Sequence, residues 1–184
     1  MRIALLATAA ALALTACGSA PQPTRTAAPA ATSTAKQGVA NLASASGSLV
    51  SGKITLTPMG NGVHLLGEVG GLQPNSTHGF HVHEKGDCSA ADASSAGPHF
   101  NPAGSPHGRA DEGAHHAGDM DNIVANAEGV AKVNMHVNGV TLGGGAPNDI
   151  AGRAIVVHAS PDDYTSQPAG NAGARVACGV IAAQ

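Results

Sequence analysis

Aromatic and charged side chains are scarce in this sequence of 184 residues. It has no Trp, one Tyr and two Phe, and only 11% of its residues are charged. A core therefore has to be built from Val, Ile, Leu and Ala. The net charge of -3 comes with no basic face, which argues against nucleic acid as a partner. Gly and Pro are abundant, at 25 and 11 residues, which favours short strands and many turns over long helices.

The first 16 residues have the pattern of a signal peptide. A positive start is followed by an apolar run from Ile3 to Leu14, which is too short to span a membrane as a helix. The next residues, Leu14-Thr15-Ala16-Cys17-Gly18, resemble a bacterial lipobox, in which the Cys becomes the lipidated first residue of the mature protein. We expect residues 1–16 to be removed and Cys17 to carry a lipid. A plain secretory signal that leaves Cys17 as a free thiol is the second interpretation.

The residue after the lipobox Cys predicts where the protein is delivered. Gly18 stands where an Asp would favour the inner membrane, so similarity to Gram-negative lipoproteins favours the outer membrane. We therefore expect an exported protein at the periplasmic face of the bacterial envelope, anchored as an outer-membrane lipoprotein. Residues 17–36 are rich in Ala, Pro, Thr and Ser and predict a flexible tether behind the lipidated Cys. Residues 37–184 are long enough for one folded domain.

The domain has the pattern of eight short strands and no credible helix. The expected strands cover residues 39–42, 49–57, 63–69, 79–83, 123–126, 130–137, 154–158 and 175–182. Asn61-Gly62 marks a hairpin turn. No periodicity survives from Glu84 to Met120, and a stretch this long without structure usually carries a function or is held by an external clamp. The pattern predicts an all-β antiparallel sandwich or flattened barrel.

Histidine is the residue present in excess, with ten copies against nine of Lys and Arg together. Neutral imidazole is the commonest metal ligand, so a His-rich domain suggests metal binding. His81 and His83 occupy alternate positions of a predicted strand, so their side chains point to the same side and can share one ion. A further His, His158, ends a distant predicted strand.

The long loop carries a second group of potential metal ligands. These are His99, His107, the adjacent pair His115 and His116, and Asp119. Three histidines and a carboxylate match the ligand set of a tetrahedral zinc site. Such a site would clamp a loop that has no secondary structure of its own. The two cysteines of the domain, Cys88 and Cys178, are far apart, and in an exported protein this favours a disulfide over two buried thiols.

Four segments together resemble the signatures of the copper,zinc superoxide dismutases. They are Gly79-Phe80-His81-Val82-His83-Glu84, Gly97-Pro98-His99-Phe100-Asn101-Pro102, Val156-Val157-His158 and Gly170 to Ile181, in the family's order. The resemblance covers nearly all of residues 37–184. It implies an eight-stranded antiparallel Greek-key β-barrel with long metal-binding and channel loops. It also implies an enzyme that dismutes superoxide to oxygen and hydrogen peroxide and so protects the cell envelope.

The resemblance implies one copper and one zinc ion per chain, bridged by a histidine. Copper would be held by His81, His83, His99 and His158, and zinc by His99, His107, His116 and Asp119. Between His115 and His116, the second keeps the family's His-x-x-Asp spacing to Asp119 and is favoured as the zinc ligand. The remaining histidines match no ligand of the family: His64, His78 and His136.

The resemblance also implies roles for residues around the metals. Asp162, four residues after His158, looks like the carboxylate that hydrogen-bonds one copper His and one zinc His. Arg175 matches the catalytic Arg that attracts the anionic substrate, and His99 would exchange a proton during turnover. Cys88 and Cys178 match the family's disulfide, although the spacing from His83 to Cys88 looks bacterial rather than animal.

Two other functions use the same residues. A non-catalytic periplasmic copper- and zinc-binding protein would share the histidines but would need neither Arg175 nor a shared His99. A structural module that resembles a dismutase but has no catalytic activity would have lost a copper ligand, whereas all four are present here. The expected partners are superoxide and, through the lipid, a membrane. The sequence does not fix the oligomeric state and leaves a homodimer open.

Overall fold

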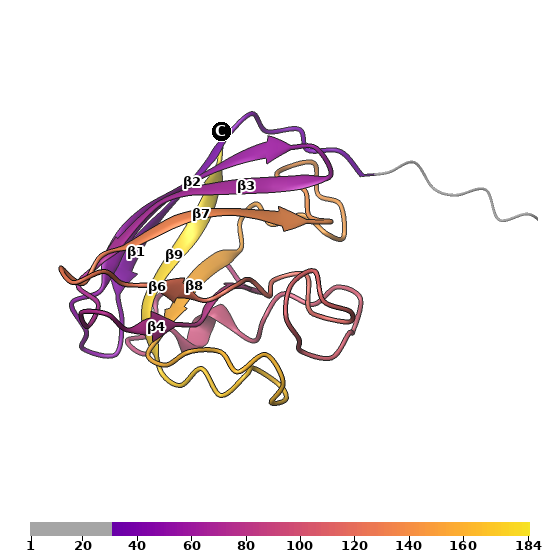
Figure 1. The fold of residues 1–184 in the computed structure, drawn as a ribbon. Helices are drawn as coiled ribbons and strands as arrows, with labels where there is room; N and C mark the ends of the chain where they lie inside the picture. Colours follow the sequence, from indigo (N-terminus) through magenta and orange to yellow (C-terminus); the bar gives the residue numbers. More distant parts are fainter. Residues whose placement is uncertain (1–30) are drawn as a thin grey trace, which may run out of the picture. The chain divides into compact units, whose positions relative to one another are not determined.

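The computed structural model describes residues 31–184, and their regular structure is almost entirely β (Figure 1). One 3-10 turn, η1 (Ser94–Ala96), is the exception. The strands are β1 (Gly38–Ser44), β2 (Ser51–Met59), β3 (Gly62–Gly70), β4 (Thr77–His78), β5 (Phe80–His83), β6 (Ile123–Val124), β7 (Ala131–Asn138), β8 (Ala154–His158) and β9 (Arg175–Ala183). The predicted signal peptide, the lipidation of Cys17 and most of the predicted tether lie outside the described residues.

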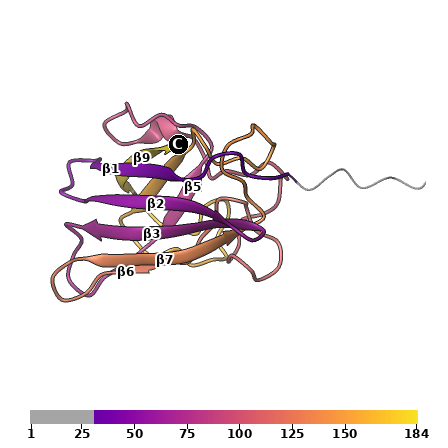
Figure 2. The ribbon, with the colours of Figure 1, turned by 90° about the horizontal axis from the view of Figure 1, so that it is seen from above.

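Seven strands form one antiparallel sheet in the order β5-β8-β9-β1-β2-β3-β7, and β4 and β6 form a small second sheet. Figure 2 shows β1, β2, β3 and β7 side by side. The chain runs from β3 to β5 and from β7 to β8, which crosses each time from one side of the sheet order to the other, as Greek-key connections do. The predicted all-β antiparallel fold is confirmed.

Eight strands were expected and the described residues form nine, because the strand expected at 79–83 begins earlier and is divided at Gly79. The Gly79 N–H donates to Ser160 O, and its carbonyl accepts from the His158 N–H, at 2.8 Å each. These bonds turn the chain between β4 and β5. The hairpin predicted at Asn61-Gly62 is present, with β2 and β3 paired from Ser51↔Gly70 to Met59↔Gly62.

The main core lies on one face of the curled sheet. Alternation along the strands sends Ile54, Leu56, Val63 and Leu65 to that face, and all four are fully buried. The core has few aromatic side chains and consists mostly of Val, Leu and Ile, as the composition predicts.

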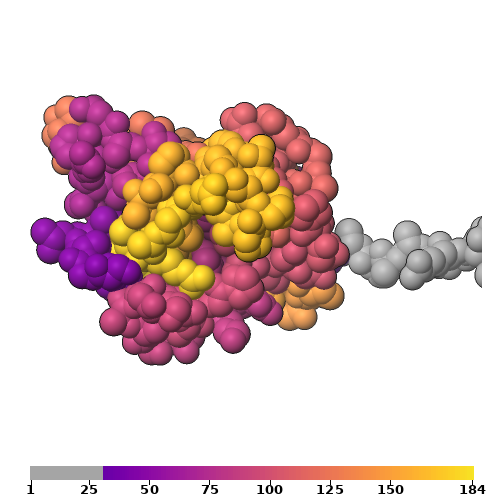
Figure 3. Space-filling model, turned by 90° about the horizontal axis from the view of Figure 1, so that it is seen from below, coloured from indigo at the N-terminus to yellow at the C-terminus, as the bar shows by residue number. Residues whose placement is uncertain are grey.

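The opposite face of β5, β8 and β9 is covered by loops instead of strands. Ala154, Val156 and Cys178 on this face pack with Ala93 and Ala96 of the loop after β5 in a second, much smaller apolar cluster. Figure 3 shows one face of the molecule on which the pink loop segments lie beside the yellow-orange segment that precedes β9. The loop after β5 also sends Phe100 and Met120 into the main core, and polar contacts hold much of the rest of this loop in place.

The first described residues are joined by hydrogen bonds to the segment between β7 and β8. Leu142 N–H donates to Ser33 Oγ at 2.9 Å, and Ala35 N–H donates to Leu142 O at 3.0 Å. Among residues 31–184, no helix is long and apolar enough to cross a membrane.

Candidate metal centre

Four histidines from three parts of the chain converge on the outer face of the sheet. His81 and His83 come from β5, His158 ends β8, and His99 lies in the loop, bridged to His83. One nitrogen of each ring lies within 4.8 Å of the others, and all four residues are buried. Because Val82 points to the core, the alternation of β5 places both of its histidines on the metal side, as the sequence predicts.

Hydrogen bonds fix the tautomer of three of these rings. His81 Nε2 donates to Asp162 Oδ2 at 2.8 Å, His83 Nδ1 to Gly97 O at 2.8 Å, and His158 Nδ1 to Gly173 O at 3.2 Å. Carbonyl and carboxylate oxygens only accept, so these nitrogens carry the proton and the other nitrogen of each ring presents a lone pair.

The lone pairs of the four-histidine group, called the copper side after the ion that the resemblance implies for it, need a cation. His83 Nε2 and His158 Nε2 face each other at 3.3 Å, and neither is protonated in the tautomers just described. His81 Nδ1 and His99 Nε2 are buried and have no hydrogen-bond partner in the described part of the chain. Four converging, unpartnered imidazole nitrogens therefore fit a transition-metal ion that imidazole ligands suit, such as copper.

A second group of ligand atoms surrounds the Asp119 carboxylate. Nδ1 of His99 is 2.8 Å from Oδ1, Nδ1 of His116 is 3.1 Å from Oδ1, and Nδ1 of His107 is 3.1 Å from Oδ2. These four residues again offer ligand atoms within 4.8 Å of one another and are buried. Three imidazoles and one carboxylate suit a tetrahedral zinc ion.

His99 belongs to both groups. Its Nδ1 lies in the carboxylate group, and its Nε2 faces the other histidines, with the His81 and His99 ring centroids 4.0 Å apart. A single imidazole with its two nitrogens directed to two clusters can bridge two metal ions.

The Asp162 carboxylate connects the two groups by accepting a hydrogen bond from one histidine of each. Oδ2 accepts from His81 Nε2 at 2.8 Å, and Oδ1 accepts from His107 Nε2 at 2.9 Å. The structure thus places Asp162 where the resemblance expects it. Gly170, at a positive φ of 63°, lies against this carboxylate, and a Cβ there would overlap Oδ1. Only glycine fits this position.

Burial and hydrogen bonds keep the ligands in their metal-binding protonation states. Burial lowers the pKa of His81 and of His83 well below the usual histidine value, and it lowers the pKa of His158 to about 4. Burial opposes ionisation of Asp119, but hydrogen bonds from His99 and from the N–H groups of His116 and Gly108 outweigh it and hold the pKa of that carboxyl below its ordinary value. Neutral imidazoles and an ionised carboxylate are the forms that bind metals.

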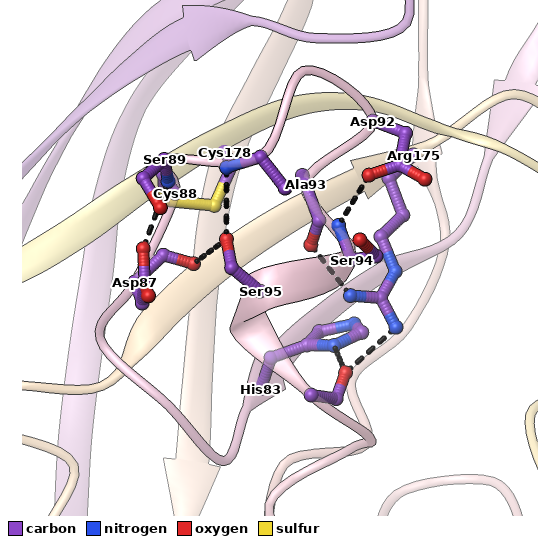
Figure 4. The surroundings of a disulfide bond; sticks show 12 residues. His83, Asp87, Cys88, Ser89, Asp92, Ala93, Ser94, Ser95, Arg175 and Cys178 are labelled. Atoms are coloured by element: carbon purple, nitrogen blue, oxygen red, sulfur yellow. Dashed lines mark hydrogen bonds between the residues drawn. A yellow bond between two sulfur atoms is a disulfide. The ribbon is translucent and has the colours of Figure 1, made fainter.

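Arg175 lies beside the copper-side group because of strand pairing. It is the residue opposite His158 in the β8–β9 pair, just past an irregularity in the register. Its Nη1 donates to Ala93 O and its Nη2 to Gly97 O, each at 2.6 Å. Gly97 O also accepts from His83, so one carbonyl joins the arginine to a copper-side histidine (Figure 4).

The predicted disulfide between Cys88 and Cys178 is confirmed, with Cα atoms 5.7 Å apart. Figure 4 shows it on the same loop that Arg175 holds. The bond ties the loop after β5 to β9, at the strand position that pairs with Val156. Loop, disulfide and arginine therefore form one connected support for the His83 side of the centre.

An open cleft of about 730 Å³ leads to the histidines. The metal-side residues His83, His99, His116 and His158 line it, together with both Arg153 and Arg175. A small anion can therefore reach the copper-side group past fixed positive charges.

The other histidines are separate from the two ligand groups. His115 Nδ1 donates to His116 O at 2.7 Å and joins neither group. His64 Nε2 lies 2.9 Å from Asn134 Oδ1 on the outer face of the sheet. His78 is buried, and its Nδ1 donates to His158 O at 2.8 Å, so it supports the strand end that carries a copper-side ligand.

Some residues that hold the ligand-bearing segments in place could not be identified from a motif or a spacing in the sequence. Asn122 exchanges two hydrogen bonds with the Asp162 backbone, at 2.8 and 2.9 Å, and Gln167 exchanges two with the His107 backbone, at 2.8 Å each. These side chains act on backbone groups of residues that are distant in sequence, and no spacing rule points to such a partner.

Comparison with known proteins agrees with this geometry. Residues 50–181 match the family model described as copper/zinc superoxide dismutase. Over 135 residues the chain is 44% identical to "Superoxide dismutase [Cu-Zn] 2" of Aquifex aeolicus (strain VF5), covering 72% of this chain and 79% of that protein. It is also similar to the crystal structure of "the clock protein EA4", with a TM-score of 0.74 and 37% identity, covering 84% of this chain and 98% of the other.

Proposed function

The chain belongs to the copper/zinc superoxide dismutase family, and on this premise we propose that its two ligand groups hold the metals of an envelope-bound dismutase. The reaction converts two superoxide ions and two protons into one oxygen and one hydrogen peroxide molecule. The enzyme uses one copper and one zinc ion per chain. The finer assignments, namely which residue holds which metal and where the enzyme works, are the proposal.

Copper is assigned to His81, His83, His99 and His158, and zinc to His99, His107, His116 and Asp119. All-imidazole ligation suits an ion that alternates between Cu(II) and Cu(I), and the carboxylate suits redox-inert zinc. The observation that carries the assignment is the shared His99, whose two nitrogens face different clusters. A simple metal-binding protein would need no such bridge, so the non-catalytic alternative is not favoured.

Copper, when bound, supplies the one-electron redox chemistry of both half-reactions. The protein supplies charge, orientation and a proton. Arg175 offers a half-buried positive charge at the cleft, which attracts superoxide toward the His158 side. His99 can take up a proton at Nε2 and donate it to the departing peroxide, while its Nδ1, which lies beside Asp119, would be held by zinc.

The test compares the metal-loaded protein with two variants. The wild type should contain one copper and one zinc and dismute superoxide in pulse radiolysis. His99→Ala should lose most of the activity and change the Cu(II) EPR spectrum, because both ions lose a ligand. His115→Ala is the matched control and should behave as wild type. Catalysis by the wild type no faster than free copper would refute the function, and a normal His99→Ala spectrum would refute the bridge.

We also propose that a lipid on Cys17 anchors the enzyme to the outer membrane, facing the periplasm. The lipobox Leu14-Thr15-Ala16-Cys17-Gly18 and the Ala- and Pro-rich segment behind it support this. Labelling of cells with a radioactive fatty acid should mark the wild type and not Cys17→Ser, and only the wild type should sediment with membranes. An unlabelled wild type would refute the anchor. A homodimer is the assembly left open by the sequence, and sedimentation equilibrium of the mature protein decides it.

A further inference from the structure

Arg153 makes three contacts that join separate parts of the chain. It stands directly before β8, and its Nε donates to Asp149 O at 2.7 Å. Its Nη1 donates to Glu84 O at 2.6 Å, and its guanidinium carbon lies 3.7 Å from the centroid of the Phe100 ring. At this distance the stacked cation and ring attract each other.

The contacts of Arg153 fall next to proposed copper ligands. Glu84 follows His83, and Phe100 follows His99. Backbone bonds already join these two segments, since Glu84 N–H donates to Pro98 O at 2.9 Å and Phe100 N–H donates to Val82 O at 2.8 Å. The Arg153 side chain lies across both segments on the wall of the cleft and connects them to the strand that ends at His158.

We propose that Arg153 is a positioning residue of the copper centre, which keeps the segments that carry His83 and His99 at their correct separation. The proposal rests on the copper ligands assigned above. A planar guanidinium can donate in two directions and stack on a ring at the same time, whereas a lysine ammonium is a point charge with no flat face. The role therefore depends on the shape of the side chain and not only on its charge.

A second effect of the same residue would be attraction of superoxide by its charge. The surroundings of Arg153 weaken this effect. Its Nε and Nη1 are occupied by backbone carbonyls, and the carboxylates of Glu84 and Asp149 act electrostatically on the guanidinium. Opposite charges close by reduce the field that an incoming anion meets. Arg175 has two carbonyl contacts as well, but its electrostatic neighbours include only one carboxylate, that of Asp92.

The experiment uses Arg153→Met, which keeps the apolar stem, and Arg153→Lys, which keeps the charge. Arg109→Met is the matched control, because Arg109 also stacks on a ring, that of Tyr164 at 5.2 Å, but lies on the exposed side of the zinc loop. Three quantities are measured on the metal-loaded proteins: the Cu(II) EPR spectrum, the rate of copper loss to a chelator, and the ionic-strength dependence of dismutation.

Both Arg153 variants should change the EPR spectrum and lose copper about 10-fold faster, as supporting residues of metal ligands typically do. The salt dependence should stay as in the wild type, and Arg109→Met should change neither copper signal. Phe100→Leu removes the stack and leaves the arginine, so it should produce the same change if Arg153→Met does not fold.

Two results would overturn the proposal. One is a wild-type spectrum and wild-type copper loss in the Arg153 variants. The other is a normal spectrum with a weaker salt dependence in Arg153→Met alone, which would make Arg153 an electrostatic guide. Activity of the wild type is measured in the same series, so failure of the dismutase function is seen separately.

Discussion

Replacement of Asp162 by Asn should weaken binding of at least one of the two metals, although Asn has almost the same shape. The two Asp162 oxygens accept from ring N–H groups of His81 and His107, at 2.8 and 2.9 Å, and all three side chains are fully buried. An amide has one accepting oxygen and one donating nitrogen, so it can satisfy only one of these rings in the present tautomers.

The consequence reaches the metals through the tautomers. If the Asn nitrogen faces His81 Nε2, that ring either keeps a buried N–H without a partner or moves its proton to Nδ1. The first outcome costs about 1–3 kcal/mol. The second removes the lone pair that copper needs. With the amide in the opposite orientation, His107 Nε2 loses its acceptor instead, and zinc binding is weakened for the same reason. We expect a loss of about 10- to 100-fold in metal affinity, which is about 1.4–2.7 kcal/mol.

The assay is competition with chelators of known affinity, run for copper and for zinc separately. Asp163→Asn is the control, because Asp163 is the next residue and its carboxylate accepts hydrogen bonds from Thr165, Ser166 and Asn171, away from the ligands. Affinities of the Asp162 variant within a factor of about two of the control, for both metals, would show that the carboxylate does not set the tautomers.

Three further predictions follow from the same contacts. Arg175→Ala should slow dismutation about 10- to 100-fold at low salt and reduce its salt dependence in pulse radiolysis, and an unchanged rate would contradict a guiding role. Replacing Cys88 and Cys178 by Ser opens a link across 90 residues and should cost about 4–5 kcal/mol of unfolding free energy in urea titrations. In the metal-free protein, the pKa of His158 is lowered to about 4, so the unfolded chain binds more protons between about pH 6.5 and pH 4. Stability should therefore fall by up to about 3 kcal/mol as the pH drops through this range, and metal-free melting curves that do not change with pH would refute it.

Strands with one buried face were predictable from their alternation. In β2, Ile54 and Leu56 enter the main core while Lys53 and Thr57 are exposed, and this alternation is visible in the sequence. β8 is buried on both faces, and its run of β-branched residues made it predictable instead. The metal ligands were found through family motifs, and Asp162 through its spacing from His158. Division of the expected strand at Gly79 was not predictable, because it depends on hydrogen bonds to Ser160 and His158, far along the chain.

Arg153 shows the limit of such reasoning. In the sequence it is an ordinary Arg before a strand, and two of its partners are backbone carbonyls, which every residue has. Only the fold shows that these carbonyls lie beside copper-side ligands. The same holds for His78, whose partner is the backbone oxygen of His158.

The position of the metal centre explains why so many polar contacts surround it. The main core lies on the inner face of the sheet. The loop that carries His99 sends only a few side chains, such as Phe100 and Met120, into that core, and on the outer face it packs in a small cluster of Ala, Val and Cys side chains. Such a cluster buries too little apolar area to order a long loop by itself. Cross-links have to supply the rest, and they are the disulfide, the two arginines and the ligands themselves. Binding of the metals therefore adds to the ordering of the loop, so removing zinc should loosen the loop even where the sheet stays intact.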